Sequence, residues 1–266
     1  MLIYFKFSYF LGAIAPFLVG IFVYLTNKDK IVNKMFFLLS LCGAIWSFGL
    51  FLMFNTQNII MSYYYRLFMD CGSILLPAFW LHFVYSILNY NGSKRKELYI
   101  CYFISIVLFT LNLFDFFIPG LFVKEIVEKS IFNFYPTAGL GYYLFFCYFL
   151  IIIPYSLFHL IRGYKNSKGF KKQQIKYIII AAILGFGGGG MSFFLTFNIP
   201  ILPYGIILFA LYPIMIAYAI TRYQLMDIRV VIRQSTVIVS TLLSILIMFL
   251  AVMWLCDYLV DLNINY

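Results

Sequence analysis

Long apolar runs separated by short polar segments make up most of the chain. Eight of these runs approach the length of about 20 residues that a helix needs to cross roughly 30 Å of hydrocarbon. A helix is expected because it satisfies its own backbone hydrogen bonds in lipid, and the runs lack the alternation of barrel strands. The predicted spans are residues 7–26, 35–54, 67–88, 99–118, 142–162, 177–197, 204–221 and 236–256. The pattern therefore predicts an all-α fold, a polytopic membrane helix bundle.

The composition supports a membrane location. Hydrophobic residues make up 64% of the chain, aromatic residues 22% and charged residues only 11%, whereas about a quarter of a soluble domain is charged. This excludes soluble enzymes, nucleic-acid binders and secreted disulfide scaffolds. The five cysteines show no CxxC spacing, which argues against a disulfide or metal framework, and we expect no metal and no cofactor. The aromatic residues are interpreted as lipid-facing positions and interfacial belts.

Lysine and arginine residues are divided unevenly between the two sides that these spans define. Fifteen lie on one side, whereas only Lys6, Arg66, Lys124 and Lys129 lie on the other. Because cytoplasmic loops carry an excess of basic residues, the first side is predicted to be cytoplasmic and the N-terminus outside. An even number of spans then returns the C-terminus to the outside. The net charge of +10 thus reflects topology rather than binding to nucleic acid.

Four polar residues near the outer ends of the third and fourth spans form the candidate outer ligand pocket. Arg66 and Asp70 are four residues apart and can pair on one helix face, while Asn112 and Asp115 share a face of the next span. If they converge under the loop at 119–141, they form the most polar spot open to an extracellular ligand. The alternative is an interfacial ion pair that anchors a helix end. The loop is predicted to be either a small hairpin or a plain surface loop.

Two spans contain residues that change how a helix packs or bends. Pro77 frees the carbonyl four residues before it and predicts a kink in the third span, where His82 is expected to hydrogen-bond a neighbouring helix. In the sixth span five glycines lie within six residues, and Gly185 and Gly189 have GxxxG spacing. Such residues allow close helix packing, and they also allow a hinge. The sequence leaves both interpretations open.

The segment after the seventh span carries a family resemblance. Residues 216–228 read IAYAITRYQLMDI and are followed by RVVIR. This segment resembles the signature that closes the N-terminal seven-transmembrane sensor region of bacterial histidine kinases. Similarity extends to Gln173-Gln174 after a basic loop, the glycine-rich sixth span, the turn at 198–200 and LPAFWLHF at 76–83, and it covers roughly residues 1–235. It implies a sensor in the bacterial cell (inner) membrane, part of a two-component system, that couples an external or intramembrane stimulus to a cytoplasmic transmitter.

The transmitter of such a kinase is not recognisable in this sequence. No phosphoacceptor-histidine helix and no Asn or Gly boxes for ATP are found, so we expect no catalytic activity. The eighth span departs from the seven-span pattern, and the chain is either a truncated kinase or a standalone module acting through a partner. The expected organisation is a seven-helix sensor module at 1–221, a basic cytoplasmic linker at 222–235, and an eighth span with a short outer tail at 236–266.

The linker is the predicted output segment. It could lie on the inner leaflet as an amphipathic stretch and transmit movement of the seventh span, or it could be a plain membrane-flanking linker. The candidate output residues are Arg222, Tyr223, Leu225, Asp227, Arg229 and Arg233.

Signal reception is thus the predicted role. A small multi-span transporter or permease subunit is the main alternative, and it would need a polar path at the midplane; a membrane enzyme or haem protein is a third. The expected partners are the lipid bilayer, a cytoplasmic kinase or other transmitter, and an unknown small ligand. The chain could form a homodimer, and no nucleic acid is expected.

Overall fold

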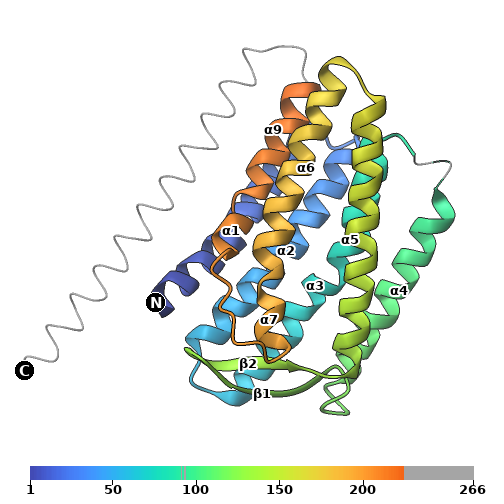
Figure 1. Ribbon diagram of the computed structural model, residues 1–266. Coiled ribbons are helices and arrows are strands. Elements are labelled where there is room, and N and C mark those ends of the chain that lie inside the picture. The colour runs from blue at the N-terminus through green and yellow to red at the C-terminus, as the bar shows by residue number, and fades with distance from the viewer. Residues whose placement is uncertain (91, 93, 225–266) are drawn as a thin grey trace, which may run out of the picture. The chain divides into compact units, whose positions relative to one another are not determined.

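The computed structural model describes residues 1–90, 92 and 94–224 (Figure 1), and Met1–Tyr223 forms one compact unit. The predicted eighth span at 236–256 and most of the predicted linker at 222–235 lie outside the described residues.

Long helices account for most of the described chain, which confirms an all-α membrane fold. Within the described residues, six helices are long and apolar enough to cross a membrane, and each coincides with one of the first six predicted spans to within a few residues at most boundaries. The sixth, Gly169–Thr196, combines α6 and the short α7. The bounds are α1 (Leu2–Thr26), α2 (Ile31–Asn55), α3 (Ile59–Ile87), α4 (Arg95–Phe114), α5 (Leu140–Asn166), α6 (Gly169–Gly190) and α7 (Ser192–Thr196).

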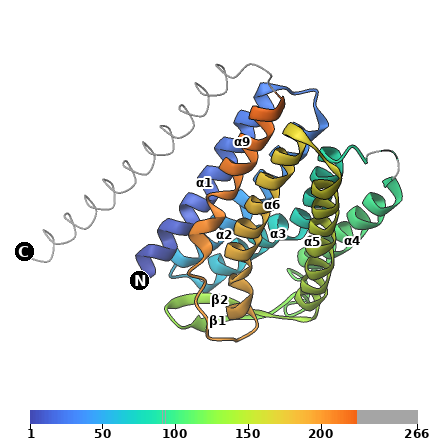
Figure 2. The same cartoon turned by 45° about the horizontal axis from the view of Figure 1, so that its top comes forward.

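Six of the segments pack against one another in a closed ring, whose long helices are seen side by side in Figures 1 and 2. In this ring α1 packs on α2, α2 on α3, α3 on α5, α5 on α6, and α6 on α8 (Ile206–Phe209), which returns to α1. Helix α4 lies outside the ring against α3 and α5. Of the six long helices, α3 is the most buried and α4 the least. The middle of the ring is therefore where early and late parts of the sequence meet.

The seventh predicted span, residues 204–221, is not one continuous helix. Residues 199–203 have no helical structure, α8 follows after a turn, and a break at Ala210 and Leu211 separates it from α9 (Tyr212–Gln224). Pro213 explains the break, because it has no backbone N–H to bond the carbonyl of Phe209 and its ring crowds that carbonyl. The apolar helical stretch Ile206–Arg222 is consequently shorter than the other six.

An antiparallel hairpin fills the 119–141 loop, so the hairpin prediction is confirmed over the plain loop. Strand β1 (Val123–Lys129) pairs with β2 (Phe132–Ala138) across one end of the bundle (Figure 1). The buried ring of Phe132 stacks on Phe54 of α2 with centroids 4.2 Å apart and meets Phe5 of α1 at 5.2 Å. The hairpin is thus part of the packed core at this end, which we call the hairpin end.

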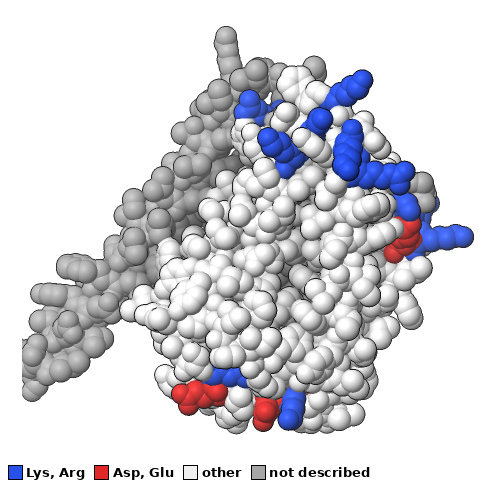
Figure 3. Space-filling view, viewed as in Figure 1, with Lys and Arg blue, Asp and Glu red and all other residues white. Residues whose placement is uncertain are grey.

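Basic residues gather at the opposite end, which we call the basic end (Figure 3). They lie at the α1–α2, α3–α4 and α5–α6 connections and at the end of α9, for example Lys28, Arg95, Lys168 and Arg222. The hairpin end carries both signs of charge on β1. This arrangement agrees with the uneven distribution of lysine and arginine found in the sequence.

Candidate functional site

The four predicted outer residues meet in one hydrogen-bonded group, which we call the outer polar cluster (Arg66, Asp70, Asn112 and Asp115). Arg66 Nη1 donates to Asn112 Oδ1 at 2.7 Å and to Asp70 Oδ2 at 3.3 Å, and Arg66 Nη2 pairs with Asp115 Oδ2. The backbone N–H of Phe122, just before β1, donates to Asp115 Oδ1 at 2.7 Å. The four residues therefore converge beneath the hairpin.

The outer polar cluster is sealed from solvent. Each of its four residues is 0% exposed, and one arginine faces two carboxylates, so the formal charge of the group is −1. Within the described part of the chain, Asp70 Oδ1 and Arg66 Nε have no hydrogen-bond partner. Burial of charge is costly unless it is paired, and the contacts of Arg66 with both carboxylates offset part of that cost. A ligand role for these residues stays a prediction.

The hairpin is also tied to α7, where the sixth span reaches the hairpin end. Lys129 Nζ donates to the carbonyl of Leu195 in α7 at 2.8 Å and to that of Pro136 at 3.0 Å, and Tyr135 Oη donates to the carbonyl of Ser192 at 2.9 Å. Partial burial lowers the pKa of Lys129 to about 8. Hairpin, outer polar cluster and α7 are therefore connected directly, which sequence spacing alone did not reveal.

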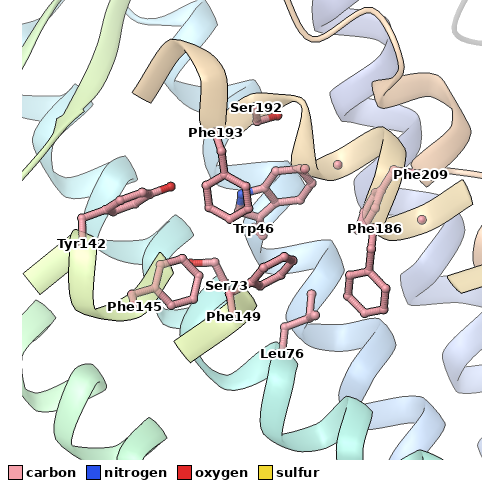
Figure 4. A pocket seen from close by; sticks show the side chains of 13 residues that line it. Trp46, Ser73, Leu76, Tyr142, Phe145, Phe149, Phe186, Ser192, Phe193 and Phe209 are labelled. Carbon is pink, nitrogen blue, oxygen red and sulfur yellow. The ribbon is translucent and has the colours of Figure 1, made fainter. Parts of the chain in front are cut away.

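An aromatic cavity of about 50 Å³ lies inside the ring of helices (Figure 4). Its walls come from α2, α3, α5, α6, α7 and α8. The lining residues are Trp46, Ser73, Leu76, Tyr142, Phe145, Phe149, Gly185, Phe186, Gly189, Gly190, Ser192, Phe193 and Phe209. Trp46 and Ser73 are only half-buried although they lie on central helices. The cavity therefore leaves part of both side chains accessible to a small molecule.

Sequence reasoning missed this cavity, although a signal for part of it exists. Tyr142, Phe145 and Phe149 follow one another at intervals of three and four residues, and Phe186 and Phe193 are seven residues apart. Both spacings place side chains on one face of a helix. Residues on one face can line a common wall, but only the order of helices in the ring brings these faces together.

The glycines of α6 divide into two groups. A methyl group added at Gly188 would lie 2.4 Å from the backbone oxygen of Gly205, and one at Gly185 would lie 3.0 Å from Tyr212. At Gly189 the nearest atoms, on Phe209 and Trp46, are 3.3 and 3.4 Å away. Gly185 and Gly189 thus occupy packing positions, and Gly188 lets two backbones approach closely. At Gly187 and Gly190 the added methyl group would meet nothing within 4 Å, so packing does not require glycine there.

At the basic end, a polar chain joins three helices. Lys171 Nζ donates to the carbonyl of Ile87 at the end of α3, at 2.5 Å, and to Gln174 Oε1 at 3.1 Å. Gln174 Nε2 in turn donates to the carbonyl of Ala219 in α9 at 3.2 Å. Gln174 is buried. It thereby connects two sequence segments, 173–174 and 216–228, that carry the family resemblance.

The predicted output residues are only partly covered by the structure. The guanidinium of Arg222 lies 5.2 Å from the centroid of the Tyr218 ring, and the backbone of Tyr223 belongs to α9. Leu225, Asp227, Arg229 and Arg233 lie outside the described residues, so their role stays a prediction.

Two expectations for α3 have different outcomes. His82 Nδ1 and Tyr102 Oη of α4 are 2.8 Å apart, which confirms a hydrogen bond to a neighbouring helix. Pro77 is buried inside a helix that continues on both sides of it, and its role as a hinge stays a prediction.

Within the described residues, no three His, Cys, Asp or Glu side chains gather as a metal site requires.

A family model described as the N-terminal 7TM region of histidine kinase matches residues 8–229. The chain belongs to this family. The match runs from the first turns of α1 to beyond the end of α9, so this 7TM region includes the outer polar cluster, the hairpin, the aromatic cavity and Gln174. It confirms the resemblance recognised at 216–228. No curated protein and no solved structure matches the chain.

Membership in the histidine kinase 7TM family has two consequences. The matched region is the membrane part of such kinases rather than their catalytic part, so the features of this chain are those of a membrane sensor region. Two-component signalling is the context that the family implies. Six membrane-length helices and the shorter Ile206–Arg222 account for the membrane segments in the described residues.

Proposed function

We propose that this chain is the signal-receiving module of a two-component receptor and that it relays a stimulus to a cytoplasmic transmitter. In this proposal the chain lies in the bacterial inner membrane with its N-terminus and hairpin outside and its basic end in the cytoplasm. The concentration of lysine and arginine at the basic end supports that orientation. The transmitter acts downstream of α9, and the kinase chemistry belongs to it.

The observation that carries the proposal is the hydrogen bond from Gln174 to Ala219. A stimulus at the hairpin end can reach α7 through Lys129 and Tyr135, and α7 continues the line of α6. At the other end of α6, Gln174 holds the backbone of α9. Movement of α6 would therefore move α9, from which the predicted output segment continues. This path is a chain of hydrogen bonds and packed helices, the kind of network through which two distant sites can be coupled.

The relay is tested by replacing Gln174, and the same replacement at the neighbouring Gln173 is the control. The chain through residue 235 is joined to the dimerisation and ATP-binding parts of a bacterial histidine kinase and reconstituted in vesicles, and autophosphorylation is measured. Gln174→Leu removes the bond to Ala219, whereas Gln173→Leu changes an exposed residue of the same type. We expect Gln174→Leu to change phosphorylation at least fivefold and Gln173→Leu to leave it unchanged. Equal phosphorylation in both well-folded variants would refute the relay.

Cysteine accessibility tests the orientation. Single cysteines at Glu128 in the hairpin and at Lys168 between α5 and α6 are introduced into a chain whose native cysteines are replaced by alanine. A membrane-impermeant maleimide should label position 128 in intact cells and position 168 only after the membrane is opened. The reverse pattern would invert the proposed topology.

A further inference from the structure

The aromatic cavity has the composition of a site for an uncharged molecule. In the part of the chain that the structure describes, no charged side chain is among its lining residues, and the only side-chain polar atoms are three hydroxyl groups and the Trp46 indole nitrogen. The hydroxyl groups belong to Ser73, Tyr142 and Ser192. Six aromatic rings besides Tyr142 provide the rest of the wall, including Trp46 and Phe193 (Figure 4). Such a surface favours an apolar molecule with one polar group.

Between α5 and α6 the wall of the cavity consists of two aromatic rings that contact each other, with centroids 5.8 Å apart. Phe149 of α5 and Phe186 of α6 line it and are half-buried. Next to them, Ile151 is 66% exposed and Ile183 is 59% exposed, as expected of residues that face acyl chains. A molecule that enters from the bilayer on this side would have to separate these two rings before it reaches Trp46.

The size of the cavity limits the ligand. Its volume of about 50 Å³ is several times the space of about 10–15 Å³ that one water-sized probe needs. It is smaller than the cavity of about 150 Å³ that holds benzene in a protein core. The space therefore encloses only a few non-hydrogen atoms, enough for the hydroxyl end of a short alcohol, whose remaining atoms would lie between the surrounding rings.

We propose that the aromatic cavity is a binding site for a small, uncharged, lipophilic molecule with a single hydroxyl group, taken from the bilayer between α5 and α6. This proposal rests on the proposed function in one respect, since it names the class of stimulus that the sensor receives. The cavity is placed to act on the output because Phe209 of α8 and the packing glycines Gly185 and Gly189 line it, and Gly185 contacts Tyr212 of α9.

Gly190 and Gly187 provide a matched pair of variants. A side chain at either position meets no atom within 4 Å of its Cβ, and both substitutions remove a glycine from the same helix. Gly190 lines the cavity and Gly187 does not. Gly190→Leu should therefore fill the cavity, while Gly187→Leu should leave it open.

The binding test uses the fluorescence of Trp46. Of the three tryptophans, Trp80 and Trp254 are replaced by phenylalanine in the full chain, which is purified in detergent. The probe is 2,2,2-trichloroethanol, a small lipophilic alcohol that quenches tryptophan. We expect saturable quenching in this background and in Gly187→Leu, and at least a tenfold higher half-saturation concentration in Gly190→Leu. n-Butanol should compete with the probe, and n-butylammonium should not.

Two results would refute the proposal that the aromatic cavity is a binding site. The first is quenching that rises linearly with probe concentration and is equal in both variants, which would identify the cavity as a packing void. The second is competition by n-butylammonium as strong as that by n-butanol. If Gly190→Leu fails to fold, Gly190→Ala replaces it and should raise the half-saturation concentration at least twofold.

A separate measurement distinguishes failure of the site from failure of the proposed function. The kinase chimera described above is exposed to trichloroethanol, and phosphorylation should change in the unsubstituted chimera and in Gly187→Leu but not in Gly190→Leu. Saturable quenching without any change in phosphorylation would refute the stimulus role and leave the binding site intact. Absence of saturable quenching would refute the site whatever the kinase does.

Discussion

Removal of the arginine from the outer polar cluster is the most informative perturbation of the hairpin end. In Arg66→Met, the buried carboxylates of Asp70 and Asp115 would face each other without the cation that contacts both. Removing one partner of a buried ion pair costs about 3–5 kcal/mol, because the remaining charge stays uncompensated. Two carboxylates remain here, so we expect a loss of folding free energy of at least about 3 kcal/mol.

Neutral replacements separate charge from packing. Asp70→Asn alone removes the surplus negative charge, and we expect it to leave stability unchanged or to raise it, because Arg66 keeps its pairing with Asp115. The triple variant Arg66→Met, Asp70→Asn, Asp115→Asn contains no charge in the outer polar cluster, and its asparagine at 115 can still accept from Phe122 N–H. Replacement of a buried ion pair by well-packed hydrophobic residues of similar volume is often close to neutral in free energy, and here methionine replaces the arginine while asparagine keeps the shape of each carboxylate. It should therefore recover most of the loss caused by Arg66→Met.

Equilibrium unfolding of the detergent-solubilised chain measures these differences. The fraction folded is followed by far-ultraviolet circular dichroism as the mole fraction of dodecyl sulfate rises in dodecyl maltoside micelles. The reasoning would be refuted if Arg66→Met were as stable as the native chain, or if the triple variant were as unstable as Arg66→Met. The second outcome would mean that hydrogen-bond geometry, rather than charge balance, holds the group together.

Three further predictions concern single positions. Gly188→Ala should destabilise the chain by about 1–3 kcal/mol through its clash with the Gly205 oxygen. Gly187→Ala should stabilise it by up to about 1 kcal/mol. The same unfolding assay measures both variants, and a Gly188→Ala variant more stable than Gly187→Ala would exclude close packing at 188. Because the folded pKa of Lys129 is about 8 against 10.5 in its unperturbed state, the folded chain binds fewer protons between these values, so stability should rise with pH across that window. Lys129→Met should remove the rise of the unfolding midpoint with pH. If the variant and the native chain had the same pH profile, Lys129 would not be the group responsible. Phe132→Ala should cost about 3–5 kcal/mol and expose the hairpin to protease, and an unchanged cleavage rate would show that the ring does not anchor it.

Local spacing predicted the composition of the outer polar cluster but not its burial. The pairing of Arg66 with Asp70 depends only on helical periodicity, and Asn112 and Asp115 follow the same rule one span later. Their burial depends on Phe122, whose N–H closes over Asp115 because the hairpin docks on the helix ends. That docking joins segments far apart in the chain and leaves no trace in local spacing.

The aromatic residues show where composition is insufficient. Many do face outward, as predicted, for example Phe103 at 68% and Phe117 at 74% exposed. Others, such as Phe145 and Phe209, are buried and line the aromatic cavity. A phenyl ring is equally suited to lipid and to a protein interior, so its position depends on which helix faces meet. The contacts of Lys129 and Gln174 could not be predicted for the same reason, since each side chain reaches the backbone of an element distant in the sequence.

The broken seventh segment limits how force can travel through the molecule. Helix α9 has 13 residues and is about 20 Å long at 1.5 Å per residue, shorter than the roughly 30 Å of hydrocarbon. We therefore expect it to be a poor piston for a push from the hairpin end, because residues 199–203 have no helical structure and the chain is broken again at Ala210 and Leu211. The hydrogen bond from Gln174 of α6 to Ala219 offers a sideways connection instead, so we expect rotation or tilt of α9 rather than axial sliding at the basic end.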